Sequence, residues 1–595
     1  ISKILRKFMP VEKKLSYYIN ESKKLNDSDF EKQTRIAVLG SFTLNGLAET
    51  IKVKCAESNV FSHTFSGGYN QYNEEMLDPK SKLYSFSPEI CFLVLDIKDI
   101  LENLFYSPYS ISDDERKKFI ENKAIEITNL IKFFVDKSQS KLIVTNFVPP
   151  TYSPYGIFES KTNYGLQEMI YDLNRKLLHE FKNNPLVYVF DFNGFVTTLG
   201  QNNIFDYRQY YFGDVRVSLE KIPYLANAFM SYVKPILGLS RKCIVLDLDN
   251  ILWGGIIGED GFNGIKLDHN DPIGKSFIEF QKYLLALHER GIILAVNSKN
   301  NFDDAIKVIK EHPNMILHEE HFACLKINWN DKVTNLREIA QEVNIGLDSM
   351  VFFDDDRMNR DFVRSTLPEV LTIEMPEDPS LYVPTLIGLN DFNVTKITEE
   401  DKQRGKMYLD QRRRTEFQKT TTDFKEYLKQ LGIKVIIKNA NEFTIPRISQ
   451  LTLKTNQFNL TTKRYQEEDI RKFVEDQNKI VECAQIQDKF GDNGITSVYI
   501  INKENEQEWF IDTFLLSCRV IGRGVEEALL SQIIKKAKKE GVKKVKAQYI
   551  KTKKNKPAEN FYSDCGFKKE GDYWVFNTDQ VMKKPEQIKL RNNTN

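Results

Sequence analysis

The chain has 595 residues, with 84 Lys and Arg against 83 Asp and Glu, which leaves a formal charge of +1. This balance excludes the basic footprint of a nucleic-acid-binding protein. No signal peptide is recognisable, and no apolar run approaches the ~18 residues of a membrane span. The seven cysteines form no metal-type pairs, which predicts free thiols in a reducing cytoplasm. The length predicts about three or four domains of roughly 150 residues each.

The first third of the chain predicts a parallel α/β domain. Residues 1–30 are Lys-rich and amphipathic, which predicts a helical lead-in. Over residues 31–235, strand-like runs alternate with helical patterns, as in parallel α/β proteins. We expect strands at 35–43, 89–96, 141–146 and 186–191, and helices at 112–137 and 165–182.

A serine follows the first of these strands. Gly40 and Ser41, with the later pair Gly67 and Gly68, resemble the Ser and Gly blocks of SGNH/GDSL-type hydrolases, which implies a flavodoxin-type domain. Those enzymes activate the serine with a late Asp-x-x-His pair, and no histidine stands between residues 180 and 268. Because a serine without a base is a weak nucleophile, we expect a non-hydrolytic domain that binds a partner or ligand.

A short apolar run at 243–246 leads into Asp247 and Asp249. Such a run is typical of a buried strand in a parallel sheet. Carboxylates at its end would lie in the crevice where α/β sheets bind ligands. An acidic turn without a catalytic role is the alternative for these two residues taken alone.

Two further strand-like runs also end in polar groups. Residues 291–298 end in a hydroxyl, and residues 350–356 end in three acids. The ordered set resembles that of the haloacid dehalogenase (HAD) superfamily of phosphotransferases, which implies a Rossmann-like domain over 236–385. The set consists of Asp247, Asp249, Ser298, Lys332, Asp354 and Asp355.

The resemblance implies a role for each group. Asp247 would be the nucleophile and form an aspartyl-phosphate, and Asp249 would act as general acid and base. Ser298 would donate to a phosphoryl oxygen, and Lys332 would supply fixed positive charge.

The resemblance also implies a Mg²⁺ site. Asp354 and Asp355 would complete it with Asp247 and the backbone carbonyl of Asp249. Without a metal, so many carboxylates would repel one another and some would protonate. The Gly-rich segment 254–264 predicts a small flap, and the resulting open site suits a large or protein-tethered substrate.

Several blocks go beyond the superfamily and resemble FkbH-like proteins, the HAD subfamily IIIC. They lie at 253–261, 328–332, 450–465, 488–494 and 517–526, so the resemblance covers at least 236–570. The chain departs from the family in having Ile251 for Thr, and Asp356 and Arg357 for Asn-Pro. These departures bear on metal affinity and on the rate of phosphoryl transfer.

The C-terminal part predicts an α+β domain over 426–580, after a helical connector at 386–425 and before a polar tail at 581–595. The basic segment 411–415 of the connector is read as a polar helix face, with a dock for a partner as the alternative. An antiparallel pair is expected at 497–502 and 508–517, followed by a helix at 525–539.

The turn before that helix resembles the Arg-x-x-Gly-x-Gly turn of GNAT acyltransferases, and a second GNAT block spans 555–567. Its N–H groups and the helix N-terminus would hold a pyrophosphate. The resemblance implies that the turn binds coenzyme A or the phosphopantetheine arm of a carrier. The residues concerned are Arg519, Gly522, Arg523, Gly524 and Asn555.

Cys518 stands between the strand and this turn. One interpretation is a buried core thiol. The other is an acyl-accepting thiol, because a nearby helix N-terminus and the flanking Arg519 favour the thiolate. No histidine occurs from residue 426 onward, so any base must come from elsewhere.

FkbH-like proteins are associated with loading a glyceryl unit from 1,3-bisphosphoglycerate onto an acyl carrier protein. The resemblance therefore implies a Mg²⁺-dependent phosphatase coupled to acyl transfer, with a small phosphorylated substrate and a carrier protein as partner. Two alternatives stay open. One is a HAD phosphatase fused to an ordinary acyl-CoA N-acyltransferase, and the other is a carrier-docking scaffold with degraded catalysis.

Overall fold

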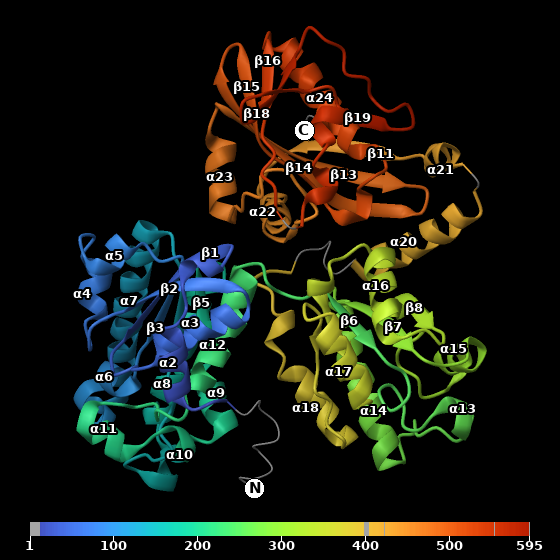
Figure 1. The fold of residues 1–595 in the computed structure, drawn as a ribbon. Coiled ribbons are helices and arrows are strands. Elements are labelled where there is room, and N and C mark those ends of the chain that lie inside the picture. The colour runs from blue at the N-terminus through green and yellow to red at the C-terminus, as the bar shows by residue number, and fades with distance from the viewer. Residues whose placement is uncertain (1–11, 398–403, 422, 553, 594–595) are drawn as a thin grey trace. The chain divides into compact units, whose positions relative to one another are not determined.

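Figure 1 presents the computed structural model, which describes residues 12–397, 404–421, 423–552 and 554–593. The chain divides into two compact units, Ile1–Ile236 and Leu237–Asn595. The HAD-type and C-terminal domains expected from the sequence both fall in the second unit. Within the described ranges, every helix falls short of the length or apolarity that crossing a bilayer requires.

Five parallel strands form the sheet of the first unit. They pair in the order β2-β1-β3-β4-β5, which is the flavodoxin-type order. All five residues of the central strand β3 are buried, as expected where helices cover both faces of a parallel sheet. The strands are β1 (Lys32–Gly40), β2 (Val60–Ser66), β3 (Ile90–Val94), β4 (Lys141–Thr145) and β5 (Val187–Phe190).

Alternate residues of β3 face two helical layers. Cys91 and Leu93 belong to one core cluster with residues of α7, whereas the ring of Phe92 stacks on Phe229 of α12, with centroids 4.2 Å apart. The helices are α2 (Leu15–Ser22), α3 (Leu47–Glu57), α4 (Tyr72–Leu77), α5 (Lys82–Phe86), α6 (Ile97–Leu101), α7 (Asp113–Ser138), α8 (Leu166–Phe181), α9 (Phe192–Leu199), α10 (Gln201–Ile204), α11 (Tyr207–Gly213) and α12 (Ile222–Ile236).

A second parallel sheet begins the second unit. Its order is β10-β9-β6-β7-β8, a Rossmann-type order with the first strand at the centre. The strands are β6 (Cys243–Leu246), β7 (Ile293–Ser298), β8 (Phe322–Ile327), β9 (Met350–Phe353) and β10 (Leu371–Thr372). The helices are α13 (Ile257–Asp260), α14 (Pro272–Glu289), α15 (Phe302–Glu311), α16 (Lys332–Val343), α17 (Arg357–Thr366) and α18 (Tyr382–Ile387).

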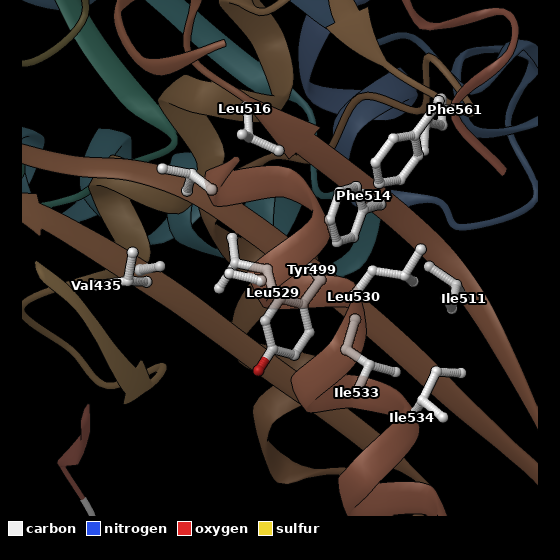
Figure 2. Packing of buried hydrophobic residues seen from close by; sticks show 14 of the residues in the cluster. Val435, Tyr499, Ile511, Phe514, Leu516, Leu529, Leu530, Ile533, Ile534 and Phe561 are labelled. Atoms are coloured by element: carbon white, nitrogen blue, oxygen red, sulfur yellow. The ribbon is translucent and has the colours of Figure 1, made fainter. Parts of the chain in front are cut away.

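The C-terminal domain is built on a nine-stranded, mostly antiparallel sheet. Figure 2 shows apolar residues of α24 and of the strands in one buried cluster. The strands are β11 (Lys434–Asn439), β12 (Phe458–Asn459), β13 (Lys479–Asp488), β14 (Gly491–Asn505), β15 (Glu508–Leu516), β16 (Lys544–Ala547), β17 (Lys568–Glu570), β18 (Tyr573–Asn577) and β19 (Lys589–Asn593). The helices are α21 (Phe424–Leu431), α22 (Ile445–Lys454), α23 (Glu467–Glu475), α24 (Val525–Lys539) and α25 (Phe561–Asp564). Helix α20 (Arg404–Lys419) precedes them and contacts β7, β8 and α16 as well as β14.

The fold differs from the expectation in a few places. The tail expected to be polar contains β19, which pairs in parallel with β11, because Ile588 and Leu590 pack on the domain core. The sequence did not predict β2 or β8, which are edge strands whose partly exposed residues include polar ones. Arg414 is buried and ion-paired with Asp488, so it does not belong to a surface dock. Of the expected lead-in, residues 1–11 lie outside the described ranges.

Candidate active site

The ends of three neighbouring strands assemble the acidic site. Strand β6 pairs in parallel with both β7 and β9, so residues that follow these strands meet at one edge of the sheet. The Asp247 N–H donates to the carbonyl oxygen of Phe353 at 2.9 Å, which places Asp247 beside Asp354. Ser298 ends the other neighbour, β7, and is buried.

A buried lysine joins two of the acids. The Nζ of Lys332 lies 2.7 Å from Oδ2 of Asp247 and 3.0 Å from Oδ2 of Asp354. It also donates to the carbonyl oxygen of Asn297 at 2.8 Å. Burial lowers the pKa of Lys332, but the two carboxylates raise it more, so the net pKa is raised. The ammonium group is therefore held charged, 1% exposed, where a phosphoryl group needs fixed positive charge.

Three acids could hold a divalent cation. Carboxylate oxygens of Asp247, Asp354 and Asp355 lie within 4.8 Å of one another. Burial, and then Asp247, raises the pKa of Asp354 to about 6, and burial raises the pKa of Asp355. A cluster of oxygen ligands whose negative charge is only partly offset fits Mg²⁺.

The carboxylate of Asp249 is directed to the flap and lies outside this cluster. Its Oδ1 accepts from Trp253 Nε1 at 2.9 Å and from the Ile257 N–H at 3.1 Å, and its Oδ2 accepts from Asn300 Nδ2 at 2.8 Å. Burial raises the pKa of Asp249. A raised pKa suits the general acid and base role that the sequence predicts.

Polar residues that the sequence analysis missed complete the site. Asn300 donates to Ser298 Oγ at 3.1 Å as well as to Asp249, so it couples the two. Asn250, with a φ of 54°, donates to Asp355 Oδ2 at 3.1 Å. Their position just after a strand end was the available signal.

The side chain of Arg360 binds the backbone of the loop that carries Asp354 and Asp355. Its guanidinium donates to the carbonyl oxygens of Asp354 and Asp355 at 2.9 and 2.6 Å. This side chain fixes the backbone that carries two candidate metal ligands. Its position on helix α17, in the first turns after the acids, gave no signal in the sequence.

The two departures from the family pattern lie in different surroundings. Ile251 is fully buried in the apolar core beneath the flap. Arg357 is exposed and lines a cavity of about 540 Å³ next to Asp355, with Lys266 on the flap side. The flap, whose only described helix is the four-residue α13, therefore leaves a hollow that reaches Asp355.

In the first unit, Ser41 lies at the carboxyl edge of the sheet, and within the described ranges no histidine is hydrogen-bonded to it. Its Oγ accepts from the Asp96 N–H at 3.0 Å. The nearby Arg216 is buried and lies 2.8 Å from oxygens of Asp96, Asp99 and Asp214. A guanidinium accepts no proton, and it pairs with all three carboxylates, so this cluster offers Ser41 no histidine-type base.

We therefore expect no stoichiometric labelling of Ser41 by a fluorophosphonate probe. The probe needs an activated hydroxyl, and the groups around Ser41 provide none. Intact-protein mass spectrometry after incubation with the probe measures the adduct, with an active serine esterase labelled in parallel. A single adduct that disappears in Ser41→Ala would contradict the expectation.

The residues expected to bind a cofactor in the C-terminal domain are brought to two loops. Arg519, Gly522, Arg523 and Gly524 lie between β15 and α24, and Asn555 lies after β16. The Gly522 N–H donates to a side chain of the same chain, so this N–H is not free for a phosphate oxygen in this form. Cys518, at the start of the 3₁₀ helix Cys518–Val520, is partly exposed.

Comparisons with known proteins agree with this architecture. A family model described as FkbH, N-terminal domain, matches residues 35–234, and one described as Acetyltransferase (GNAT) family matches residues 446–567. A solved structure of the N-terminal part of BF1531 from Bacteroides fragilis, described as containing a phosphatase domain complexed with Mg, is 29% identical. It covers 65% of this chain and 100% of its own, with a TM-score of 0.59.

Smaller structures resemble one part of the chain. A domain from Methanocaldococcus jannaschii DSM 2661 and a GNAT-family acetyltransferase from Staphylococcus aureus Mu50 are 16% and 14% identical. Each covers 24% of this chain and 99% of its own, with TM-scores of 0.21 and 0.20. No curated protein matches the chain.

Fold, site and comparisons define a multidomain α/β protein that joins a phosphatase-type domain to an acyltransferase-type domain. More particularly, the chain combines an FkbH N-terminal domain with a C-terminal GNAT domain. The resemblance to FkbH-like proteins and the expected fold class are thereby confirmed.

Proposed function

We propose that the chain is a Mg²⁺-dependent HAD-type phosphatase whose C-terminal domain loads a glyceryl unit onto the thiol of an acyl carrier protein. The observation that carries the proposal is the buried bridge from Lys332 to Asp247 and Asp354 at the edge of a parallel sheet. The substrate would be 1,3-bisphosphoglycerate. The Mg described for the BF1531 fragment supports the metal, and the GNAT match supports acyl transfer. Seven unpaired cysteines favour a cytoplasmic location.

The acidic site provides the groups for cleaving a phosphate ester. Asp247 attacks phosphorus and the bond to the leaving oxygen breaks, while Asp249 gives that oxygen its proton. Lys332 and Ser298 hold the phosphoryl oxygens. Water then hydrolyses the aspartyl-phosphate and releases its proton to Asp249. Mg²⁺, held by the three clustered acids, would offset the negative charge of carboxylates and phosphate.

The acyl step needs no phosphatase chemistry. The carboxyl phosphate of 1,3-bisphosphoglycerate is a mixed anhydride, so the thiolate of Cys518 can attack its carbonyl carbon. The C–O bond to phosphate breaks, phosphate leaves and a thioester remains. The carrier thiol then takes the acyl group by transesterification. The 3-phosphate is an ester whose uncatalysed hydrolysis is extremely slow, so its removal requires Asp247.

If this order holds, Asp247→Asn should accumulate a phosphoglyceryl adduct on Cys518, because the thioester forms but the 3-phosphate stays. Cys518→Ala should accept no acyl group, although it should still cleave a generic phosphate ester. Intact-protein mass spectrometry with 1,3-bisphosphoglycerate and without carrier measures both. Cys565→Ala, which removes another partly exposed thiol, is the matched control and should behave as the wild type.

The remaining outcomes separate the alternatives. An unmodified Cys518 in Asp247→Asn, under conditions where the wild type loads the carrier, would assign acyl transfer to direct attack by the carrier thiol. Phosphate release that never depends on a carrier would favour a phosphatase fused to an N-acyltransferase. A protein that binds carrier but turns over no phosphate ester would be a docking scaffold.

A further inference from the structure

The turn before α24 has the backbone shape that its motif predicts. Gly522 and Gly524 have φ angles of 77° and 86°, a left-handed conformation that favours glycine. Such turns bind phosphate through free N–H groups at a helix N-terminus. Here, however, the Gly522 N–H donates to Oε1 of Glu526 at 2.8 Å. A carboxyl group of the chain therefore already uses one N–H of this turn.

Glu526 is not an ordinary surface cap of the helix. Only 6% of its surface is exposed, and its Oε2 is buried with no hydrogen-bond partner in the described part of the chain. Burial, and then the neighbouring Glu527, raises the pKa of Glu526 to about 7, while Arg523 opposes the rise. The chain therefore keeps a carboxyl group inside the turn although burial disfavours its charge.

The Arg523 side chain and the surroundings of Gly524 also involve other parts of the chain. Arg523, 8% exposed, donates to Gln411 Oε1 at 2.6 Å and lies 3.4 Å from Asp488 Oδ2. A Cβ built on Gly524 would lie 3.0 Å from Gln587 Nε2 and 3.4 Å from Pro585. Residues that follow β18 thus cover the start of α24 from outside.

A neighbouring edge of the sheet is filled in the same way. Strand β15 pairs with β16 only over Glu508–Ile511, and beyond that point it pairs with β12. The Leu460 N–H donates to the carbonyl oxygen of Phe514 at 3.2 Å, and the Leu460 carbonyl oxygen accepts from the Ile550 N–H at 2.8 Å. The chain itself therefore fills this edge against the pantetheine of free coenzyme A and of a carrier arm alike, and only the turn before α24 separates the two.

Asn555 helps to hold the segments that fill this edge of β15. It is fully buried, and its Nδ2 donates to the carbonyl oxygens of Asn459 and Ile550 at 3.1 and 2.8 Å. Its Oδ1 accepts from the Thr552 N–H at 2.8 Å. The residue therefore ties the two segments together and offers no free group to a cofactor.

From these contacts we propose that Glu526 is a specificity-determining residue that excludes free coenzyme A from the C-terminal domain. Resting on the proposed function, this assigns the acyl acceptor to a protein-tethered thiol. Free coenzyme A carries a pyrophosphate, whose negative charges would have to displace the Glu526 carboxyl from Gly522. The arm of a carrier protein has a single phosphodiester at the carrier surface, so its thiol can approach without entering this turn.

The test is calorimetric titration of free coenzyme A into the full-length protein and three variants. Glu526→Ala frees the Gly522 N–H and should bind coenzyme A about tenfold tighter or more than the wild type, as for one hydrogen bond to a charged group. Glu526→Gln removes the charge but keeps an acceptor for the Gly522 N–H, so its affinity for coenzyme A should rise less than that of Glu526→Ala. Glu527→Ala removes an adjacent carboxyl but keeps the bond between Glu526 and Gly522, and should gain less affinity than Glu526→Ala.

Two results would overturn the inference. One is micromolar binding of coenzyme A by the wild type, and the other is a folded Glu526→Ala or Glu526→Gln protein that binds no tighter than the wild type. A transfer assay with 1,3-bisphosphoglycerate and pantetheine as acceptor then checks the proposed function separately. Failure of the wild type to acylate pantetheine or a carrier would reject acyl transfer, whereas the binding comparison among variants would stand.

Discussion

Asp247→Asn should lower kcat/KM for phosphate release on the order of thousands-fold, as for other covalent nucleophiles. An amide has nearly the shape of the carboxylate but cannot form the aspartyl-phosphate. The fold should survive, because an acceptor oxygen remains for the Leu248 N–H and Lys332 keeps its contact with Asp354. Hydrolysis of p-nitrophenyl phosphate with Mg²⁺, together with a thermal melt, measures both effects.

Asp361→Asn is the matched control for this change. Asp361 is an exposed acid on α17 that pairs with Arg364 and, at 3.5 Å, with Arg357 at the cavity, so its loss changes the same net charge while leaving the clustered acids in place. Its turnover should stay close to that of the wild type. Retained turnover in a purified Asp247→Asn protein would remove Asp247 from the role of nucleophile.

Lys332→Met should lose both activity and stability. The substitution leaves Asp247 and Asp354 facing each other in a buried site, and breaking a buried pair in this way costs about 3–5 kcal/mol. Mg²⁺ should restore more stability to the variant than to the wild type, because a cation that binds the folded carboxylates favours the folded state. Denaturant unfolding with and without Mg²⁺ measures this difference.

Lys326→Met is the control that shows how much stability is lost when a paired lysine outside the site is removed. Lys326 lies 3.0 Å from both Glu338 and Glu342 and is 20% exposed, and pairs near the surface contribute about 1 kcal/mol or less. Its loss of stability should be smaller and insensitive to Mg²⁺. Equal losses of stability in Lys332→Met and Lys326→Met would mean that the buried Lys332 bridge stabilises the fold no more than a pair near the surface.

Much of the phosphatase-type site could be predicted from the sequence, because residues at the ends of parallel strands must meet at one edge. The run at 243–246 and the later runs ending at Ser298 and Asp354 are short, apolar and followed by polar groups, so their chemistry is readable. The role of a residue on a helix, such as Lys332, could be predicted only from the family resemblance. The spacing in sequence between such a residue and the strand ends does not by itself show that its side chain reaches the site.

The contacts that orient these groups could not be predicted in this way. Asn300 and Trp253 bind Asp249 through side chains whose direction depends on how the flap folds back. In the C-terminal domain the glycine spacing predicted the backbone of the turn, but not that Glu526 fills it. The occupant comes from the helix that follows, where an acidic residue in the first turn is ordinary.

The pairing of β19 with β11 has a consequence for biosynthesis. Of the described strands of this sheet, β11 leaves the ribosome first and β19 leaves it last. Until residues 589–593 are translated, the outer edge of β11 stays open, and an open strand edge can pair with another chain. The nascent domain therefore depends on β19 to cover this edge. A stop codon at position 589 should yield an aggregation-prone product while leaving every candidate site residue in place.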